Sequence, residues 1–304
     1  MGMGNRIRGN KVLKENTLFG TRDKVKISID RLKAFEPPEG YYGAFSGGKD
    51  SQTVYHLSEE AGVRVDWHYN LTTVDPPELV KFIKTNYPDV AIDKSDTTMW
   101  KLIEENRMPP TRIVRYCCAE LKEGGGAGRF VITGVRWAES SRRKNTREIV
   151  EFDVYGSQSK KALNQREIFK MSDNDNKRMM LENCTIKGKH ILNPIVDWED
   201  DEVWEYIKSR NIKYCSLYDE GFPRLGCIGC PMAKQSRRVS EFERWPKYKQ
   251  NYLRAFQRMI NKNIKDGNDR FINETPEDVM EWWIYGTVND KHIDGQTDIF
   301  DEGE

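Results

Sequence analysis

A short polar segment, Ser46–Ser51 (SGGKDS), has the composition of a phosphate-binding loop. The apolar run Tyr41–Phe45 before it predicts a buried strand, and apolar residues at helical spacing follow it. At such a junction the N–H groups of the first helical turn and the helix dipole point at the same spot, which favours an anion. The segment therefore predicts an anion site. A polar turn that binds nothing is the alternative.

The residues of this loop have distinct expected parts in binding phosphates. Gly47 and Gly48 let the backbone approach the phosphates, and Lys49 adds a positive charge. Asp50 is expected to orient the loop or to help hold Mg²⁺, and the serines at either end supply hydroxyl groups. The spacing differs from that of the Walker loop. The residues expected to bind the nucleotide here are Ser46, Gly47, Gly48, Lys49, Asp50 and Ser51.

Four of the six cysteines form two close pairs that are distant in the sequence. They are Cys117, Cys118, Cys227 and Cys230. In a cytosolic chain, clustered cysteines favour metal or redox chemistry over disulfides. Two pairs of thiolates can close one four-sulfur site. Zinc, whose cysteine pairs are normally spaced apart, and reduced thiols without metal are the alternatives. Cys184 and Cys215 lack partners at useful spacing and are expected to be small buried residues.

The elements that would position these residues alternate between strand and helix. Strands are expected at Tyr41–Phe45, Val63–Tyr69 and Phe130–Thr133, and helices after Pro76-Pro77 and over Met99–Glu105. Such alternation predicts an α/β fold with a doubly wound, mainly parallel sheet. Ligands of such sheets bind beyond the carboxyl ends of the strands, which is where the SGGKDS loop falls.

Four regions are expected along the chain. They are a basic N-terminal arm (1–35), a nucleotide-binding domain (36–232), a mobile insertion within it (156–190) and a mostly helical C-terminal region (233–304). The C-terminal region is expected to hold a helix around Phe242–Ile260 and another that begins at Thr275-Pro276.

The net charge is only +1, but it is unevenly distributed. Residues 234–265 are basic and residues 266–304 are acidic. Phe242, Trp245 and Tyr248 alternate with the basic side chains, so this stretch is a candidate for binding nucleic acid, with an amphipathic helix face as the alternative. No apolar run is long enough to span a membrane, and the N-terminus lacks the apolar stretch of a signal peptide, so a cytoplasmic location without a membrane partner is expected.

Several stretches together resemble the PAPS-reductase family of the PP-loop ATP pyrophosphatase superfamily. They are SGGKDS, the Cys117-Cys118 pair, Thr133–Arg136 (TGVR), Asn193–Trp198 (NPIVDW), and Leu217–Phe222 (LYDEGF) followed by Gly226–Pro231 (GCIGCP). The resemblance implies an adenine nucleotide alpha hydrolase-like fold and an adenine nucleotide as ligand. It also implies a [4Fe–4S] cluster on Cys117, Cys118, Cys227 and Cys230, as in bacterial APS reductases and the DNA-phosphorothioation protein DndC.

The resemblance extends to further nucleotide ligands. It implies that Gly134 and Arg136 lie at the nucleotide, with Arg136 contacting a phosphate or sulfate. Asp75 lies in a segment where relatives carry a loop facing the nucleotide, and an ordinary turn is the alternative. Arg143, with Arg142 and Arg147, is a further candidate anion ligand.

One departure from the family changes the expected reaction. Sulfonucleotide reductases carry a nucleophilic cysteine in a C-terminal Glu-Cys-Gly-Leu/Ile-His element, and this sequence has no cysteine after Cys230. The complete SGGKDS loop also suits an intact ATP tail. The expectation is therefore an ATP-dependent adenylating enzyme for sulfur transfer, with Lys49, Asp50, Arg136 and Mg²⁺ as its catalytic groups.

The expected partners are a cysteine desulfurase as sulfur donor and a nucleic acid as acceptor. Two alternatives stay open. One is an APS or PAPS reductase or sulfurtransferase that uses another thiol, such as Cys184 or Cys215. The other is a non-catalytic regulatory module that binds a nucleotide and a cluster.

Overall fold

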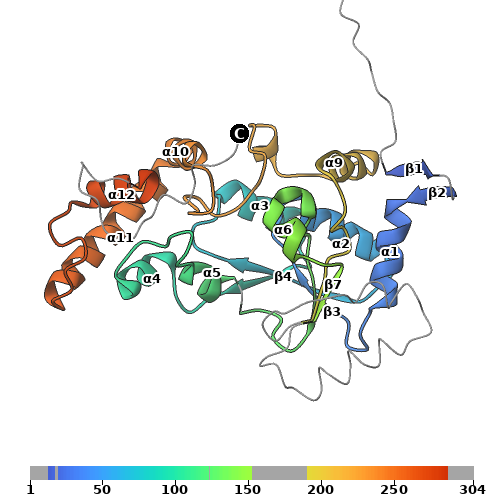
Figure 1. The fold of residues 1–304 in the computed structure, drawn as a ribbon, viewed down its shortest axis with the longest axis horizontal. Coiled ribbons are helices and arrows are strands. Elements are labelled where there is room, and N and C mark those ends of the chain that lie inside the picture. Colours follow the sequence, from blue (N-terminus) through green and yellow to red (C-terminus); the bar gives the residue numbers. More distant parts are fainter. Residues whose placement is uncertain (1–12, 18–19, 123, 153–189, 287–304) are drawn as a thin grey trace, which may run out of the picture. The chain divides into compact units, whose positions relative to one another are not determined.

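The chain folds into two compact units, each built from segments that are distant in the sequence. The computed structural model describes residues 13–17, 20–122, 124–152 and 190–286 (Figure 1). Unit 1 comprises residues 1–69, 78–92 and 125–225. Unit 2 comprises residues 70–77, 93–124 and 226–304. The division differs from the expected boundary at residue 232, because two internal segments belong with the C-terminal helices.

Unit 1 is built on a six-stranded sheet with the order β5-β4-β3-β6-β8-β7. Its strands are β3 (Tyr41–Ala44), β4 (Val65–Leu71), β5 (Ala91–Lys94), β6 (Phe130–Ile132), β7 (Val150–Phe152) and β8 (His190–Leu192). The β3 strand pairs in parallel with both β4 and β6, and β6 pairs in parallel with β8. The edge strand β7 is antiparallel to β8. The expected α/β fold with a mainly parallel sheet is therefore confirmed.

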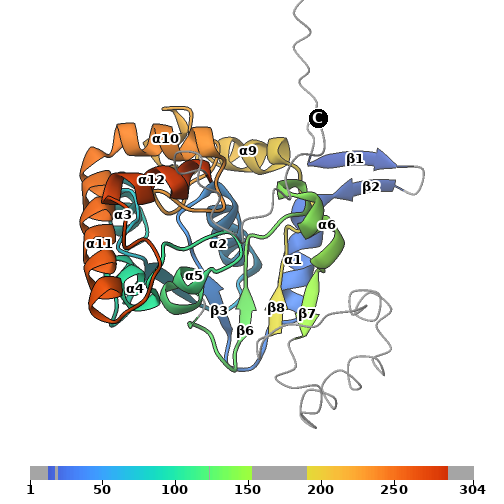
Figure 2. The same ribbon diagram turned by 60° about the vertical axis from the view of Figure 1, so that its left-hand side comes forward.

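The chain reverses its direction of travel across the sheet between β3 and β6. From β3 it moves outward through β4 to β5, and β6 then lies on the other side of β3 (Figure 2). Such a reversal puts the right-handed crossover helices on opposite faces and opens a crevice at the strand ends. The SGGKDS loop follows β3 and the TGVR segment follows β6, so both lie at this crevice.

The helix after the SGGKDS loop, α2 (Lys49–Ala61), is held by packing on its neighbours. It contacts α1 (Lys24–Ala34) and α9 (Asp200–Ser209), and it ends at Gly62, which adopts φ 68°. Beneath it, β3 and β4 lie so close that a Cβ on Gly43 would be 2.2 Å from Trp67. Only glycine fits there. The other elements of unit 1 are α3 (Pro77–Asn86), α6 (Ser141–Thr146) and the 3₁₀ turns η1 (Trp137–Glu139) and η2 (Ser216–Tyr218).

The described part of the expected N-terminal arm is structured. Lys14–Thr17 (β1) pairs antiparallel with Gly20–Asp23 (β2), and α1 follows directly. The basic side chains of α1 have acidic partners on the α9 side: Arg31 Nη1 lies 2.7 Å from Asp197 Oδ1. These basic residues were predicted only as part of a basic N-terminal arm, because their acidic partners lie far away in the sequence. Residues 1–12 lie outside the described residues.

Unit 2 is mostly helical, as expected for the C-terminal region. Its helices are α4 (Met99–Asn106), α5 (Tyr116–Leu121), α10 (Gln235–Arg244), α11 (Pro246–Lys265) and α12 (Pro276–Tyr285). The α11 helix packs on α4, α10 and α12. The expected start of α12 is confirmed, because the Thr275 side chain accepts from the Asp278 N–H.

The single helix expected around Phe242–Ile260 is instead two helices. The break lies at Trp245, which has φ −124° and ψ 68°. Pro246 lacks an N–H and disfavours the helical conformation in the residue before it. Phe242 and Trp245 are 4% and 7% exposed, so they are not free to stack on bases. The amphipathic-helix alternative accounts for this stretch.

Three expectations fall on other parts of the chain. The insertion (156–190, except His190 in β8), Cys184 and the acidic tail after residue 286 lie outside the described residues. Within the part of the chain that is described, no helix combines the length and apolar character needed to cross a membrane.

The contact between α1 and Asp197 makes a prediction about stability. Burial alone would raise the pKa of Asp197, but the hydrogen bonds and charge of Arg31 lower it overall. Both side chains are largely buried, so Asp197→Asn should leave Arg31 unpaired and lower the free energy of unfolding by about 3 kcal/mol at pH 7. Urea unfolding checks this, with Asp30→Asn on the exposed face of α1 as control.

The same pair predicts a pH dependence. Because the folded-state pKa of Asp197 is lowered, its stabilisation is complete above the unfolded value of about 4 and is lost as the pH falls through the folded value. The stability difference between the wild-type chain and Asp197→Asn should therefore shrink below about pH 4. A difference that is constant with pH would contradict this account.

Candidate functional site

The SGGKDS loop is held in shape by its own hydrogen bonds. Ser51 Oγ accepts from the Ser46 N–H at 3.2 Å and donates to the Gly48 carbonyl at 3.0 Å. Gly47 adopts φ +69°, and a Cβ there would lie 2.7 Å from the Ile83 side chain. The loop therefore needs glycine at this position and is preformed around the start of α2.

The first turn of α2 has an unexpected hydrogen-bond partner. Gly48 is the N-cap and offers no side chain to the helix amides. The Lys49 N–H instead donates to the hydroxyl of Tyr218 in η2, at 2.8 Å. Burial raises the pKa of Tyr218, so this hydroxyl stays neutral. Tyr218 lies in the LYDEGF stretch, which the sequence analysis used for the resemblance without assigning it a contact.

Four charged side chains meet beside the loop. Arg136 Nε donates to Asp50 Oδ1 at 2.7 Å, and Arg136 Nη2 donates to Asp200 Oδ1 at 2.7 Å. Lys49 Nζ lies 3.1 Å from the same Asp200 oxygen and 3.7 Å from Asp50 Oδ2. Two cations and two carboxylates thus form one group at the crevice, which we call the charged cluster.

The members of the charged cluster differ in exposure. Arg136 is 1% exposed and also donates to the Trp198 carbonyl at 3.2 Å. Its guanidinium thus lies between the two carboxylates and bonds to both. The Asp200 side chain is 59% exposed, against 20% for Asp50. Asp200 thus faces solvent at the crevice. From the sequence Asp200 was assigned only to a helix start, so its contact with Arg136 and Lys49 was not predicted.

Their surroundings shift the pKa values of the two carboxylates in opposite directions. Burial raises the pKa of Asp50 by more than Arg136 and Lys49 lower it. Burial also acts to raise the pKa of Asp200, but there the hydrogen bonds from Arg136 and Lys49 outweigh it, so the pKa is lowered. Neighbouring carboxylates whose environments separate their pKa values are typical of reaction sites.

The loop after β6 lies directly against the start of α2. A Cβ on Gly134 would be 2.8 Å from the Asp50 carbonyl carbon and 3.0 Å from the Ser51 nitrogen. This close approach lets the following Arg136 reach both carboxylates. The structure therefore brings the SGGKDS loop, Gly134 and Arg136 together, and their contact with a nucleotide stays a prediction.

Two arginines, Arg143 and Arg224, share one carboxylate near the charged cluster. Arg143 pairs with Glu139, and Arg224 Nη1 lies 3.2 Å from the other oxygen of the same carboxylate. Glu139 also accepts from the Arg136 N–H at 3.2 Å, which ties the two groups together. Burial and the nearby Arg224 lower the pKa of Arg143. Arg147 is instead paired with Glu151. Arg143 thus stays a candidate anion ligand, with one carboxylate shared between two arginines.

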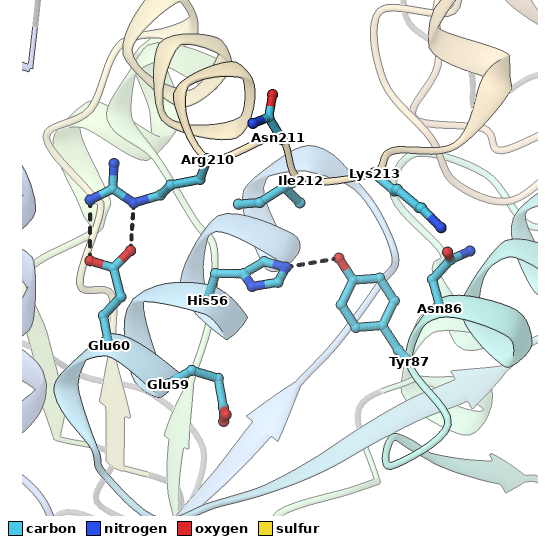
Figure 3. A pocket seen from close by; sticks show the side chains of 9 residues that line it. All are labelled: His56, Glu59, Glu60, Asn86, Tyr87, Arg210, Asn211, Ile212 and Lys213. Carbon is cyan, nitrogen blue, oxygen red and sulfur yellow. Dashed lines mark hydrogen bonds and ion pairs between the residues drawn. The ribbon is translucent and has the colours of Figure 1, made fainter.

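A cavity of about 450 Å³ lies at the other end of α2 (Figure 3). It is lined by His56, Glu59, Glu60, Asn86, Tyr87, Arg210, Asn211, Ile212 and Lys213. None of these belongs to the SGGKDS loop. A chain of hydrogen bonds nevertheless connects the cavity lining to the SGGKDS loop. His56 Nε2 and the Tyr87 hydroxyl lie 3.2 Å apart, and Tyr87 donates to Gln52 Oε1 at 3.3 Å. Gln52 Nε2 then donates to the Gly47 carbonyl at 2.8 Å.

Unit 2 holds all four cysteines of the two close pairs, and all are free thiols. Cys117 and Cys118 lie on α5, and Cys227 and Cys230 lie on the turn before α10. A hydrogen bond with Cys118, burial, and the nearness of Cys227 and Cys230 all raise the pKa of the Cys117 thiol. We call these four residues the cysteine site.

The Cys227–Cys230 turn is fixed by buried contacts. The Ile228 N–H donates to the Val74 carbonyl at 2.8 Å, and the Ile228 carbonyl accepts from the Tyr252 hydroxyl at 3.0 Å. Gly229 adopts φ +72°, its N–H donates to Glu241 at 2.8 Å, and a Cβ on it would lie 2.6 Å from Phe242. The turn is therefore shaped by helices that follow it in the sequence.

Asp75 lies in unit 2, beside the cysteine site. Its carboxylate accepts from the Thr72 N–H at 2.6 Å, and the Thr72 hydroxyl lies 3.4 Å from Cys227 Sγ. Asp75 is 5% exposed and caps its own turn. Its expected contact with a nucleotide stays a prediction.

The cysteine site has the donors for an iron–sulfur cluster. Among the described residues, no three His, Cys, Asp or Glu side chains converge on a point that could hold a single metal ion. Four thiols from two segments are the donor set of a cluster with several irons. The buried Arg238 has two N–H groups without partners, and an anionic group bound to the thiols would suit them. The residues therefore fit such a cluster.

This chain is similar to several known proteins, of which three are described. An uncharacterized 37.8 kDa protein of Escherichia phage 186 is 26% identical over 180 residues, which is 59% of this chain and 47% of the phage protein. Adenosine 5′-phosphosulfate reductase of Oceanobacillus iheyensis is 42% identical over 52 residues, 17% of this chain and 22% of the reductase. The chain spans less than half the length of both relatives. The crystal structure of phosphoadenylyl-sulfate reductase from Candida auris has a TM-score of 0.42 at 15% identity, covering 67% of this chain and 89% of that chain.

The family match covers the residues of the charged cluster and those of the cysteine site. The family model described as the phosphoadenosine phosphosulfate reductase domain matches residues 41–233, well over half of the chain. The matched segment runs from β3, which leads into the SGGKDS loop, past the second cysteine pair of the cysteine site. The chain therefore belongs to the phosphoadenosine phosphosulfate reductase domain family.

Proposed function

We propose that this chain is an adenine-nucleotide enzyme that cleaves ATP between the α- and β-phosphates and adenylates an acceptor for sulfur transfer. The observation that carries the proposal is the charged cluster beside the SGGKDS loop, which combines Lys49 and two carboxylates. Cys215, the cysteine of unit 1 within the described residues, is 1% exposed. Groups of this kind suit phosphate chemistry better than attack on sulfur.

The residues have separate roles in this proposal. The N–H groups at the start of α2 and Lys49 would bind the phosphates, which requires Lys49 to leave Asp200 and Tyr218 to release the Lys49 N–H. Arg136 would hold Asp50 and Asp200 in place. Mg²⁺ is commonly bound by one or two carboxylates together with substrate phosphates, so Asp50 and Asp200 fit it. When bound, the metal neutralises phosphate charge.

The proposed reaction balances in three steps. An oxygen of the acceptor attacks the α-phosphorus, the bond to the β-phosphate oxygen breaks, and pyrophosphate leaves. The terminal sulfur of a persulfide, such as that of a cysteine desulfurase, then bonds to the acceptor atom that carried this oxygen, and AMP leaves with the oxygen. A second thiol finally reduces the S–S bond, which leaves the sulfur on the acceptor and the two donor thiols joined as a disulfide. A nucleic acid is the proposed acceptor.

The cysteine site would hold a [4Fe–4S] cluster on Cys117, Cys118, Cys227 and Cys230. Bound there, a cluster supplies electron transfer or a site for sulfur. The protein's own part is to join α5 to the Cys227–Cys230 turn and to surround the thiols with the hydroxyl of Thr72 and the charge of Lys122.

A sulfonucleotide reductase is the second candidate, favoured by the short similarity to adenosine 5′-phosphosulfate reductase. Such a reaction needs a thiolate to attack sulfur. Burial raises the pKa of Cys215, which disfavours its thiolate. This candidate would therefore need a thiol from another part of the chain, such as Cys184, or from a partner protein.

Nucleotide specificity separates these candidates. Anaerobically purified protein is offered ATP, APS or PAPS with mixed DNA and RNA as acceptors, and pyrophosphate and sulfite are assayed. We expect pyrophosphate from ATP and no sulfite, and Asp200→Asn should lower the rate because it removes a charge that faces the crevice. Sulfite from APS or PAPS would overturn the proposal. Nucleotide binding without either product would identify a regulatory module.

The role of Arg136 is tested by Arg136→Lys. A lysine keeps the charge but cannot donate to both carboxylates and the Trp198 carbonyl at once. We expect pyrophosphate release to fall about 100-fold and the Mg²⁺ concentration for half-maximal rate to rise. Arg129→Lys, at a surface pair with Asp66, is the control. An Arg136→Lys chain with the wild-type Mg²⁺ dependence would contradict a positioning role.

The cluster is tested by metal analysis of anaerobically purified protein. We expect about four irons and four sulfides per chain, and loss of both in Cys230→Ser. Cys215→Ser should keep them, because Cys215 is buried in unit 1 and is not one of the four residues of the cysteine site. Zinc without sulfide in the wild-type chain would rule out the cluster.

A further inference from the structure

Among the residues that the structure describes, no acidic side chain pairs with the buried Arg238 on α10. Arg238 is 5% exposed, and its Nη1 donates to the Trp283 carbonyl at 2.6 Å. Its guanidinium carbon lies 4.2 Å from the centre of the Trp283 ring. Its Nε and Nη2 are buried without any hydrogen-bond partner. A buried charge with two unpaired donors is costly, so native proteins normally supply an anion or acceptor for it.

The described protein groups around Arg238 do not supply that anion. The nearby carboxylate of Glu241 is already committed: one oxygen accepts from Arg237 Nε at 2.8 Å and the other from the Gly229 N–H at 2.8 Å. The hydroxyl of Tyr252 donates to the Ile228 carbonyl. A further cation, Arg112, lies close enough to disfavour the Arg238 charge.

The cysteine site lies next to Arg238 in unit 2. A Cβ on Gly229, which lies between Cys227 and Cys230, would be 3.3 Å from the Trp283 ring, and the Arg238 guanidinium lies over the same ring. Burial lowers the pKa of this guanidinium to about 10. Arg112 approaches the same region, donating to the Pro231 carbonyl at 3.1 Å. A four-thiolate cluster in its oxidised [4Fe–4S]²⁺ form carries a net charge of −2, since four thiolate charges exceed the two positive charges of the core.

We propose that Arg238 is a positioning residue for the cluster, whose buried charge and unpaired N–H groups stabilise the anionic four-thiolate group at the cysteine site. This inference rests on the proposed cluster and adds a residue that is not one of its ligands. The cation stabilises the more negative, reduced state most, so it raises the reduction potential. The same charge slows the release of iron, because it offsets the negative charge of the four-thiolate group.

The test uses the full chain, loaded anaerobically with ferrous iron and sulfide. Arg238→Met removes charge and donors while keeping much of the volume. Arg238→Gln removes the charge but keeps a donor for the Trp283 carbonyl, and Arg238→Lys restores a charge. Arg258→Met is the matched control, because Arg258 belongs to a half-exposed pair with Glu104 on α11 of the same unit. Iron and sulfide content, the rate of iron loss to a chelator and the midpoint potential are measured.

We expect the wild-type chain and Arg258→Met to behave alike. Arg238→Met should lose iron about 10-fold faster and titrate at a more negative potential, with Arg238→Lys nearer to the wild type. If Arg238→Met fails to fold, by circular dichroism, the same shifts in Arg238→Gln decide the question. Wild-type iron retention and potential in the neutral variants would overturn the role of Arg238. A wild-type chain that binds no iron and sulfide would overturn the cluster itself.

Discussion

The buried guanidinium of Arg136 is the contact on which the arrangement of the charged cluster depends. It joins three segments that are far apart in the chain: the start of α2 through Asp50, the loop after β6 that carries it, and the start of α9 through Asp200 and the Trp198 carbonyl. Breaking one such contact leaves a charge buried without a partner. The guanidinium of Arg136 therefore stabilises the fold and also fixes the orientation of the two carboxylates. Gly134 makes this possible, because any side chain there would push the loop away from Asp50.

Local patterns in the sequence predicted the elements of unit 1 and the phosphate loop well. The run Tyr41–Phe45, the glycines and the helical repeat after them act over a few residues, so a single segment reveals them. The same is true of the cap at Thr275, which depends on its own next turn. The mainly parallel sheet followed from the alternation of strands and helices.

Contacts between distant segments were not predictable in this way. Asp200 lies in a run of acidic residues that reads as an ordinary helix start, and only the fold shows that it meets Arg136 and Lys49. Tyr218 offers no local signal for its bond to the first amide of α2. The basic residues of α1 were assigned to a basic N-terminal arm because Asp197, the partner of Arg31, is more than a hundred residues away in the sequence. The aromatic residues Phe242 and Trp245 are likewise compatible, in the sequence alone, with a nucleic-acid-binding face or with a core. Their burial in the structure places them in the core.

Unit 2 is assembled from three separate stretches of chain, and this has a consequence for biosynthesis. The cysteine pair on α5 leaves the ribosome long before the Cys227–Cys230 turn is made, and that turn is shaped by Glu241 and Tyr252, which come later still. The sheet from β3 to β8 is already synthesised at that stage. Delivery of any metal group to these thiols therefore belongs to the end of synthesis or after it, when the last helices close around the turn. A nascent chain stalled before that point exposes an unprotected pair of adjacent thiols.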